Sequence, residues 1–437
     1  MPALRRVLLV LGLALLGLGL LAPLGASATT TEDDLLAQAA TEVRGRVRGA
    51  DGPAPDIAIS VEQDGTAVGS TTTDADGNWA VELPGGGTYT VVVDTSTLPE
   101  GLSLREERFA AQDVEVDDGE SKAVLVPLVS AEGGGAGVSA TSRFLNLLVS
   151  GIKLGAIIAI TSVGLSLIFG VTGLVNFAHG ELVAIGAVAA WFFHVGPDGR
   201  RMPLVLAALL AVLVGAAAGG ALERGLFRPL RRRRTGLISL LVITIGLSFF
   251  VRHLILVIYG AGANKYIDYA VQTDLVQLGP VTIAPRDLVT TLVALAVLGA
   301  VGLMLQRTKL GTAMRAVADN KDLAESSGID VKRVILAVWV LGGGLAAMGG
   351  VMQGLVVGGV QWDMGFRLLL LMFAGVIVGG IGTAYGAMVG GLLVGITSEV
   401  STFWFSVDLK LVFAFLVLIV VLLFRPQGLL GKKERFG

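Results

Sequence analysis

The stretch Phe169-Gly-Val-Thr-Gly-Leu-Val-Asn-Phe-Ala-His-Gly-Glu181 decides the fold of this chain. It lies between two long apolar runs, yet it holds several glycines and three polar side chains, Asn176, His179 and Glu181. Lipid cannot satisfy free backbone amides, so a glycine-broken polar stretch at membrane depth has to line a protein cavity or a water-filled path. Broken helices of this kind hold the working groups of transporters. The stretch therefore predicts a membrane conduit.

The composition is that of a membrane protein. Of 437 residues, 53% are hydrophobic and only 16% are charged, with 61 glycines and a mean hydropathy of +0.76. Soluble domains carry about 25% charged residues, so these values predict a mainly α fold, a polytopic bundle of transmembrane helices. The glycine content suits close helix packing in lipid. The net charge of −2 gives no sign of a nucleic-acid partner.

The sequence offers no catalytic site. It contains no cysteine, which excludes disulfides, thiolate metal sites and cysteine nucleophiles. Ser/His/Asp sets, paired carboxylates and metal-ligand clusters do not occur at useful spacings. The phosphate-binding motif G-x-x-x-x-G-K-[ST] is also absent. We therefore predict a protein that is not an enzyme and that holds no cofactor or metal.

The N-terminus, residues 1–28, reads as a secretory signal peptide. Arg5 and Arg6 form its positive end, residues 7–21 its apolar core, and Ala26-Ser-Ala28 a small-residue cleavage site. The core is slightly long, so an uncleaved signal anchor is the alternative. In both cases the following segment is delivered across the membrane.

A small all-β sandwich is expected over residues 42–130. Short strands bounded by Gly, Pro, Asp and Asn turns are predicted at 43–48, 57–61, 78–83 and 88–93. The pattern resembles the carboxypeptidase regulatory-like domain, which implies adhesion or docking and no chemistry. Asp74 and Asp76 are predicted as turn acids, because the later ligands of a calcium loop are missing. Residues 131–142 form a Gly-rich linker.

Residues 143–437 are predicted to be a transmembrane domain of eight or nine spans. A span needs about 20 apolar residues. The apolar windows lie near 144–169, 181–195, 203–224, 236–258, 287–306, 333–357, 366–382, 387–401 and 409–424.

Loop charges set the expected orientation. Basic residues crowd three segments, 224–234, 307–333 and 425–435. The positive-inside rule places all three in the cytoplasm. With nine spans, the sandwich then lies outside, where the signal delivers it, and the C-terminus lies in the cytoplasm.

The loop from Gln306 to Arg333 is unlike the others. Leu310, Met314 and Val317 recur at helical spacing, which predicts a short amphipathic helix, and a second short helix follows and ends near Gly328. Two helices on the cytoplasmic face suit docking into a groove of a partner. A solvated loop beside lipid headgroups is the alternative.

The membrane half resembles permease subunits of branched-chain amino-acid ABC transporters of the LivH type. The resemblance covers about two thirds of the chain, and its matching runs occur in order along it. They are Gly164-Leu-Ser-Leu-Ile-Phe-Gly170, Gly173-Leu-Val-Asn-Phe-Ala-His-Gly-Glu181, Glu223-Arg-Gly-Leu-Phe-Arg-Pro-Leu230, Gly311-Thr-Ala-Met-Arg-Ala-Val-Ala-Asp319, Gly379-Gly-Ile-Gly-Thr-Ala-Tyr-Gly386 and Arg425-Pro-Gln-Gly-Leu429.

The resemblance implies an importer of the bacterial cytoplasmic membrane. Two permeases would form the path, separate ATP-binding cassette ATPases would drive it, and an extracytoplasmic solute-binding protein would deliver the solute. The cytoplasmic coupling loop that meets the ATPase would contain Gly311, Thr312, Arg315, Ala316, Asp319, Ala324 and Gly328.

The predicted substrate path consists of Asn176, His179 and Glu181 with Gly173 and Gly180. Asn176 offers both a donor and an acceptor to an amino acid. His179 either touches the solute or makes a hydrogen bond that pins the broken helix. Glu181 opens the next helix, where a carboxylate meets the positive end of the dipole and acts as a structural cap.

Other charges lie within the apolar windows, namely Lys153, Arg252, His253 and Glu399. Such charges face the bundle interior or snorkel to the interface, and for Arg252 we predict snorkelling. Lys153, Arg252 and His253 depart from the family pattern, which leaves the solute open. A urea or short-amide importer remains an alternative. A membrane-anchored adhesion or receptor protein is a second, although nine spans exceed what an anchor needs.

Overall fold

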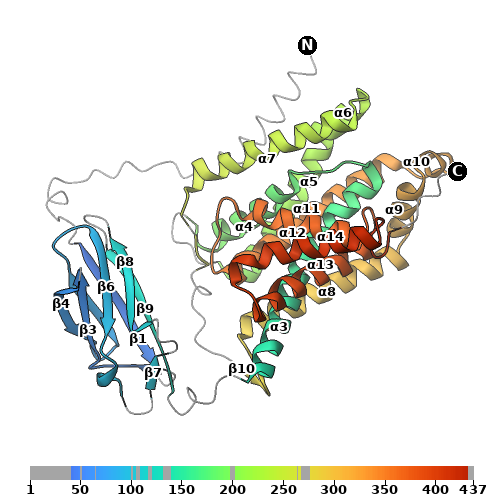
Figure 1. Ribbon diagram of the computed structural model, residues 1–437. Helices are drawn as coiled ribbons and strands as arrows, with labels where there is room; N and C mark the ends of the chain where they lie inside the picture. The colour runs from blue at the N-terminus through green and yellow to red at the C-terminus, as the bar shows by residue number, and fades with distance from the viewer. Residues whose placement is uncertain are drawn as a thin grey trace, which may run out of the picture. The chain divides into compact units, whose positions relative to one another are not determined.

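The computed structural model describes residues 41–49, 52–63, 65–99, 102–104, 109–116, 121–130, 139–196, 202–262, 264–266 and 276–431. The described residues form two compact units, a β unit that ends at Ser139 and a helical unit that begins at Ala140 (Figure 1). The predicted signal peptide and most of the predicted linker lie outside the described residues.

The β unit is a sandwich of two sheets. One has the order β2-β1-β9-β7 with β5 also paired to β1, and the other has the order β4-β3-β6-β8. Strands β1 and β9 pair in parallel, and the remaining pairs in the two sheets are antiparallel. The strands are β1 Glu42–Gly49, β2 Gly52–Pro53, β3 Ala58–Gln63, β4 Thr66–Thr72, β5 Asn78–Glu82, β6 Gly87–Val93, β7 Leu102–Leu104, β8 Ala111–Val116 and β9 Ser121–Ser130.

Alternation along the strands explains the sandwich. In β6, Tyr89, Val91 and Val93 are buried while the residues between them are not. The four strands predicted from the sequence correspond to β1, β3, β5 and β6. The Asp74 carboxylate accepts hydrogen bonds from the backbone N–H groups of Asp76 (2.9 Å) and Asn78 (2.7 Å), as a turn acid does.

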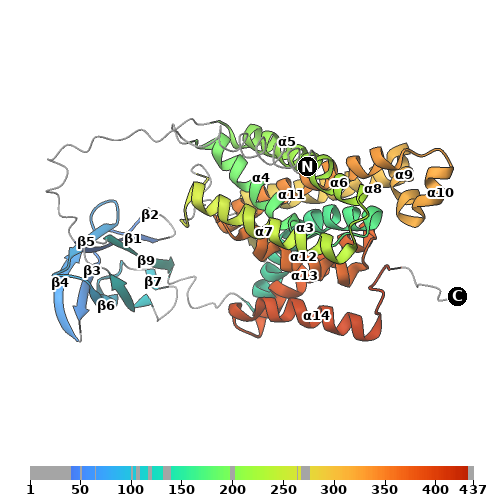
Figure 2. The same ribbon diagram turned by 90° about the horizontal axis from the view of Figure 1, so that it is seen from above.

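The helical unit contains the apolar helices and a pair of short helices at one end (Figures 1 and 2). A small hairpin, β10 Val276–Leu278 and β11 Val281–Ile283, precedes α8. The helices are α3 Ala140–Thr172, α4 His179–His194, α5 Leu204–Leu222, α6 Arg228–Arg232, α7 Leu237–Tyr259, α8 Pro285–Arg307, α9 Lys309–Asp319, α10 Lys321–Ser326, α11 Val331–Val357, α12 Met364–Gly379, α13 Ala384–Val400 and α14 Lys410–Phe424.

Among the described residues, seven helical segments are long and apolar enough to cross a membrane, namely those containing α3, α5, α7, α8, α11, α13 and α14. Two further apolar helices, α4 and α12, have 16 residues each. At 1.5 Å per residue they span about 24 Å, less than the roughly 30 Å of a hydrocarbon core. The nine predicted windows thus coincide with nine helices, but two of these are too short to span alone. The helix starts lie within four residues of the predicted window starts, as for α3, which begins at Ala140, and α4, which begins at His179.

Helices α3 and α11 form the centre of the unit. Within their most apolar windows, 83% of α3 residues and 67% of α11 residues are buried, against 6% for α14 and 22% for α7. Glycines permit the close approach of α13 to α3, since a Cβ added to Gly395 would lie 2.2 Å from the Cα atom of Gly155. Helix α7 runs along one edge of the unit in Figure 1 and leaves most of its surface uncovered.

Candidate functional site

The predicted break is present between α3 and α4. Helix α3 ends at Thr172, and Gly173 follows with φ +68°, a conformation that favours glycine. The Oδ1 atom of Asn176 accepts a hydrogen bond from the N–H group of Ala178 (3.1 Å). The N–H group of Phe177 donates to the hydroxyl of Thr244 in α7 (3.2 Å). The break is therefore a bonded turn inside the protein rather than a free loop.

His179 connects the start of α4 to α3. Its Nε2 atom lies 3.1 Å from the carbonyl oxygen of Thr161, and its side chain is fully buried. This contact is the pinning hydrogen bond that the sequence offered as one of two roles. Asn176 is also fully buried, whereas Gly173 is exposed. The structure thus brings Asn176, His179, Gly180 and Glu181 together and leaves Gly173 at the surface.

The two short helices begin side by side. A Cβ added to Gly180 would lie 2.7 Å from the carbonyl oxygen of Gly365, and a Cβ added to Gly365 would lie 2.0 Å from that of Gly180. The first turns of α4 and α12 therefore touch backbone to backbone, and only glycine fits at this contact. We call the region where Gly180 meets Gly365 the short-helix junction. Two helix N-termini converge here, and each carries partial positive charge.

Glu181 and Arg252 form an ion pair at the short-helix junction. Oε1 of Glu181 accepts hydrogen bonds from Nε (3.3 Å) and Nη2 (3.2 Å) of Arg252 and from the hydroxyl of Ser248 (2.8 Å). The guanidinium carbon of Arg252 also lies 4.0 Å from the ring centroid of Phe366 in α12. The residues Glu181 and Arg252 are 2% and 7% exposed, so the charges are desolvated and depend on each other.

This ion pair corrects two predictions. Arg252 does not snorkel, because its guanidinium is held inside the protein by Glu181. Glu181 does lie in the first turn of α4, but its carboxylate accepts hydrogen bonds from Ser248 and Arg252 of α7. A signal was available in α7, where Thr244, Ser248 and Arg252 recur every four residues and so share one face of an apolar helix.

Three polar atoms at the break have no hydrogen-bond partner among the described residues. They are Nδ2 of Asn176, Nδ1 of His179 and Oε2 of Glu181, and all three are buried. Buried polar atoms are normally satisfied, so each such atom needs an explanation. A side-chain amide offers a donor and a carboxylate oxygen offers an acceptor, the two functions that a small zwitterion requires.

The predicted pair of short loop helices is present as α9 and α10. Thr308 caps α9 by accepting a hydrogen bond from the N–H group of Gly311 (3.0 Å), and Asn320 caps α10 through that of Leu323 (2.9 Å). The two helices lie at one end of the helical unit in both views (Figures 1 and 2). Gly311 is needed for packing, because an added Cβ would lie 2.4 Å from the carbonyl oxygen of Leu305.

The predicted coupling residues divide into two groups. Thr312, Arg315 and Asp319 are exposed, whereas Gly311 and Ala324 are buried and Ala316 is half-buried. Gly328 is exposed and has φ +84°, so it ends the helical pair for backbone reasons. The first group can touch another protein, and the second group fixes the shape of the surface.

A π-helical turn, Glu223–Phe227, joins α5 to α6 near the basic loop. Its carboxylate, Glu223, is buried and ion-paired with Arg231. Phe227 stacks on Trp339 of α11 with ring centroids 4.7 Å apart. The extra residue of a π-helical turn explains how the side chains of Glu223 and Phe227 are both buried.

Comparison with known proteins places these features in a family. Residues 147–422 match the family model described as "Branched-chain amino acid transport system / permease component". Residues 42–128 match the model of the carboxypeptidase regulatory-like domain.

Individual relatives agree. The chain is 32% identical over 303 residues to the high-affinity branched-chain amino acid transport system permease protein BraD of Pseudomonas aeruginosa, covering 67% of this chain and 97% of the relative. It is 29% identical over 299 residues to LivH of Escherichia coli strain K12, covering 67% and 96%. It is 25% identical over 279 residues to the galactose/methyl galactoside import permease protein MglC of the same strain, covering 60% and 78%. The chain therefore belongs to the branched-chain amino acid transport system permease family and is a permease subunit of an ABC importer.

Proposed function

We propose that this permease translocates branched-chain or related aliphatic amino acids by alternating access. The observation that carries the proposal is the set of unpaired buried polar atoms at the short-helix junction, on Asn176, His179 and Glu181. In transporters with discontinuous helices, the N-termini of short helices point at anionic groups of the substrate near the midplane. A carboxylate would meet the positive helix ends, and an ammonium would meet Glu181. The mainly apolar surroundings suit an aliphatic side chain.

We also propose the partners and the orientation. The basic segments support a cytoplasmic position for α9 and α10, where their exposed residues Thr312, Arg315 and Asp319 would dock an ATPase subunit. ATP would be bound by that subunit. A second permease, an extracytoplasmic solute-binding protein and membrane lipid complete the set of expected partners. The sandwich would lie outside, and the C-terminus inside.

The proposal is tested by uptake in cells that lack this permease and retain the other importer subunits. Labelled leucine, urea and galactose are offered with and without the restored permease. Galactose is included because a galactose permease is among the relatives. Recovery of leucine uptake is the expected result. Recovery of urea or galactose uptake alone would contradict the amino-acid assignment and keep the importer architecture.

The role of Asn176 is tested by Asn176→Ser in the same cells. Serine is uncharged and keeps a side-chain oxygen that can accept the hydrogen bond from Ala178, and it removes the Nδ2 donor, which has no partner among the described residues. We expect leucine uptake to fall by about tenfold or more, as for the loss of one hydrogen bond to a charged group. The amount of permease in the membrane should not change. Unchanged uptake would mean that Asn176 does not touch the solute.

The adhesion or receptor alternative is tested by removing the sandwich. Deletion of residues 42–130, with the signal and linker retained, leaves the permease domain whole. If the chain is a transporter, membrane insertion and some leucine uptake persist. Loss of all function with normal insertion would favour the sandwich as the working part.

A further inference from the structure

A cavity separate from the short-helix junction lies between the start of α3, the hairpin strand β11 and the start of α8. Its volume is about 250 Å³, many times the roughly 10–15 Å³ that one water needs on the same measure. Asn146, Val149, Ser150 and Lys153 of α3 form one wall, and Thr282 to Ala284 with Asp287 form the other. The N–H group of Thr282 donates to Oδ1 of Asn146 (2.9 Å), which ties the hairpin to α3.

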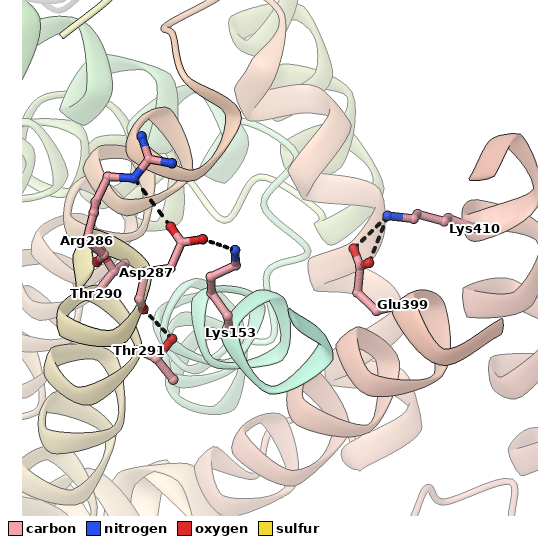
Figure 3. Close-up of polar contacts among 7 residues, drawn as sticks. All are labelled: Lys153, Arg286, Asp287, Thr290, Thr291, Glu399 and Lys410. Atoms are coloured by element: carbon pink, nitrogen blue, oxygen red, sulfur yellow. Dashed lines mark hydrogen bonds and ion pairs between the residues drawn. The ribbon is translucent and has the colours of Figure 1, made fainter. Parts of the chain in front are cut away.

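Two charged side chains, Lys153 and Asp287, line this cavity, and Arg286 contacts the Asp287 carboxylate without belonging to the lining. Nζ of Lys153 lies 2.6 Å from Oδ2 of Asp287, and Nε of Arg286 lies 3.3 Å from Oδ1 of the same carboxylate (Figure 3). Their side chains are 14–17% exposed. The cavity therefore presents one ammonium and one carboxylate in a mostly buried place, and these groups are complementary to the carboxylate and the ammonium of a zwitterion.

The cavity is amphipathic. Lys153, Asp287 and Ser150 provide its polar lining, while Val149, Ile283 and Ala284 provide an apolar lining. Ligand sites combine an apolar surface with a few placed polar groups in this way. A small molecule with a carboxylate, an ammonium and an aliphatic side chain matches all three parts. A simple inorganic anion would use only the ammonium of Lys153.

We propose that this cavity is a second binding site for a zwitterionic aliphatic amino acid, at the end of the path where α3 begins. The ligand carboxylate is bound by Lys153, the ammonium by Asp287, and the side chain lies against Val149 and Ile283. The charge pattern places this end outside the membrane, so the site receives the solute before the short-helix junction. The inference rests on the proposed amino-acid transport.

A second ion pair near the cavity serves as a control that distinguishes ligand binding from a purely structural link between two helices. Nζ of Lys410 lies 2.8 Å from both carboxylate oxygens of Glu399 and joins α14 to α13 (Figure 3). Neither residue lines the cavity. Both pairs link two helices by one lysine and one carboxylate, but only the Lys153–Asp287 pair faces the cavity. The Glu399–Lys410 pair is therefore the matched control.

The experiment uses the absence of cysteine from the chain. Ser150→Cys places a single thiol in the cavity, and Ser406→Cys places one in an exposed turn outside it. The full chain in lipid nanodiscs is labelled with a neutral maleimide, with and without leucine. At leucine concentrations about ten times Kd, mass action leaves about one site in eleven free, so labelling of Ser150→Cys should slow about tenfold. Labelling of Ser406→Cys should not change.

Further arms test the chemistry of the ligand. Leucinamide lacks the carboxylate and should protect Ser150→Cys far less than leucine does. Adding Lys153→Met should abolish protection by leucine, whereas adding Lys410→Met should leave it intact. Equal protection by acetate and leucine would overturn the zwitterion site. Protection that survives Lys153→Met would overturn the assignment of the carboxylate to Lys153.

The inference and the proposed function fail in different ways. If leucine uptake returns in cells but leucine never protects Ser150→Cys, the second site is overturned and amino-acid transport stands. If no leucine uptake returns, the proposed function fails first, and the second site fails with it.

Discussion

The break before α4 and the break before α12 differ in what holds them. Before α4, the side chains of Asn176, His179 and Glu181 are buried and bonded within the turn or to α3 and α7. Before α12, the backbone of Val360 pairs with that of Asn264. There Asp363 pairs with Arg367, whose side chain is 71% exposed.

The difference indicates which of the two breaks is held more firmly by hydrogen bonds to other helices. The α4 break is bonded both to α3, which precedes it, and to α7, so its geometry is linked to the packing of several helices. At the α12 break, the hydrogen bonds and the ion pair cited here come from its own residues and from the Val360–Asn264 contact, and α7 adds ring contacts to Trp362 and Phe366. Both reach the same place, the contact of Gly180 with Gly365. We expect the first break to be fixed and the second to be the easier one to move.

The largest effect should come from closing the contact that both breaks share. Gly365→Val puts a Cβ within 2.0 Å of the carbonyl oxygen of Gly180, so the two first turns cannot approach. We expect loss of the folded protein, measured as the fraction that elutes as a single species from detergent size-exclusion chromatography. A variant that folds and transports normally would mean that the two helices need not touch.

The ion pair of the α4 break gives the next effect. Glu181→Gln leaves Arg252 buried without its charged partner, which should cost about 3–5 kcal/mol of unfolding free energy. The double variant Glu181→Gln with Arg252→Met should recover most of this loss. Ser248→Ala is the control: it removes the hydrogen bond to Glu181 and the one from Arg252, about 1 kcal/mol each, and leaves the charge pair in place. Thermal unfolding in detergent measures all three. Equal midpoints for Glu181→Gln and wild type would show that the pair does not hold the break.

A matched pair of glycines compares the two breaks directly. Gly173 and Gly358 have φ +68° and +79°, and an added Cβ would meet nothing within 4 Å at either. Alanine at either position should therefore cost only the left-handed backbone strain, about 1–2 kcal/mol. Thermal unfolding of Gly173→Ala and Gly358→Ala should show similar losses. A much larger loss at Gly173 would mean that the buried contacts of the α4 break make it more rigid.

The smallest effect is expected at the exposed pair of the α12 break. Arg367→Ala removes an exposed pair spaced by four residues, worth about 0.3–0.5 kcal/mol. Its unfolding midpoint should be nearly that of wild type at ordinary salt. A drop comparable to that of Glu181→Gln would contradict the local character of this break.

The sequence predicts the parts of this fold that are set locally. Apolar windows of about 20 residues identify the nine helices, and Thr308, Asn320 and Asp330 are capping residues that fix α9, α10 and the start of α11. Five described strands of the sandwich, β2, β4, β7, β8 and β9, are not among the predicted ones. The polar and small residues of β4, Thr66–Thr72, carry no apolar alternation, whereas β9 carries it in Val124, Val126 and Leu128 and could have been found.

The parts that depend on distant contacts could not be read in the same way. Glu181 and Arg252 are 71 residues apart, and Lys153 and Asp287 are 134 apart. No local pattern says which intramembrane charge meets which. The contact of Gly180 with Gly365 is likewise invisible, because each glycine alone suggests only close packing.

The placement of Arg252 has a consequence for how the protein is made. An arginine at the centre of a helix raises the cost of its insertion by about 2.5–3.5 kcal/mol. The chain is synthesised from the N-terminus, so Glu181 leaves the ribosome 71 residues before Arg252 does. The Glu181 carboxylate is therefore already synthesised when α7 inserts, so α7 inserts as part of an assembling protein rather than alone. Correct integration of a late helix therefore depends on a carboxylate placed by an early one.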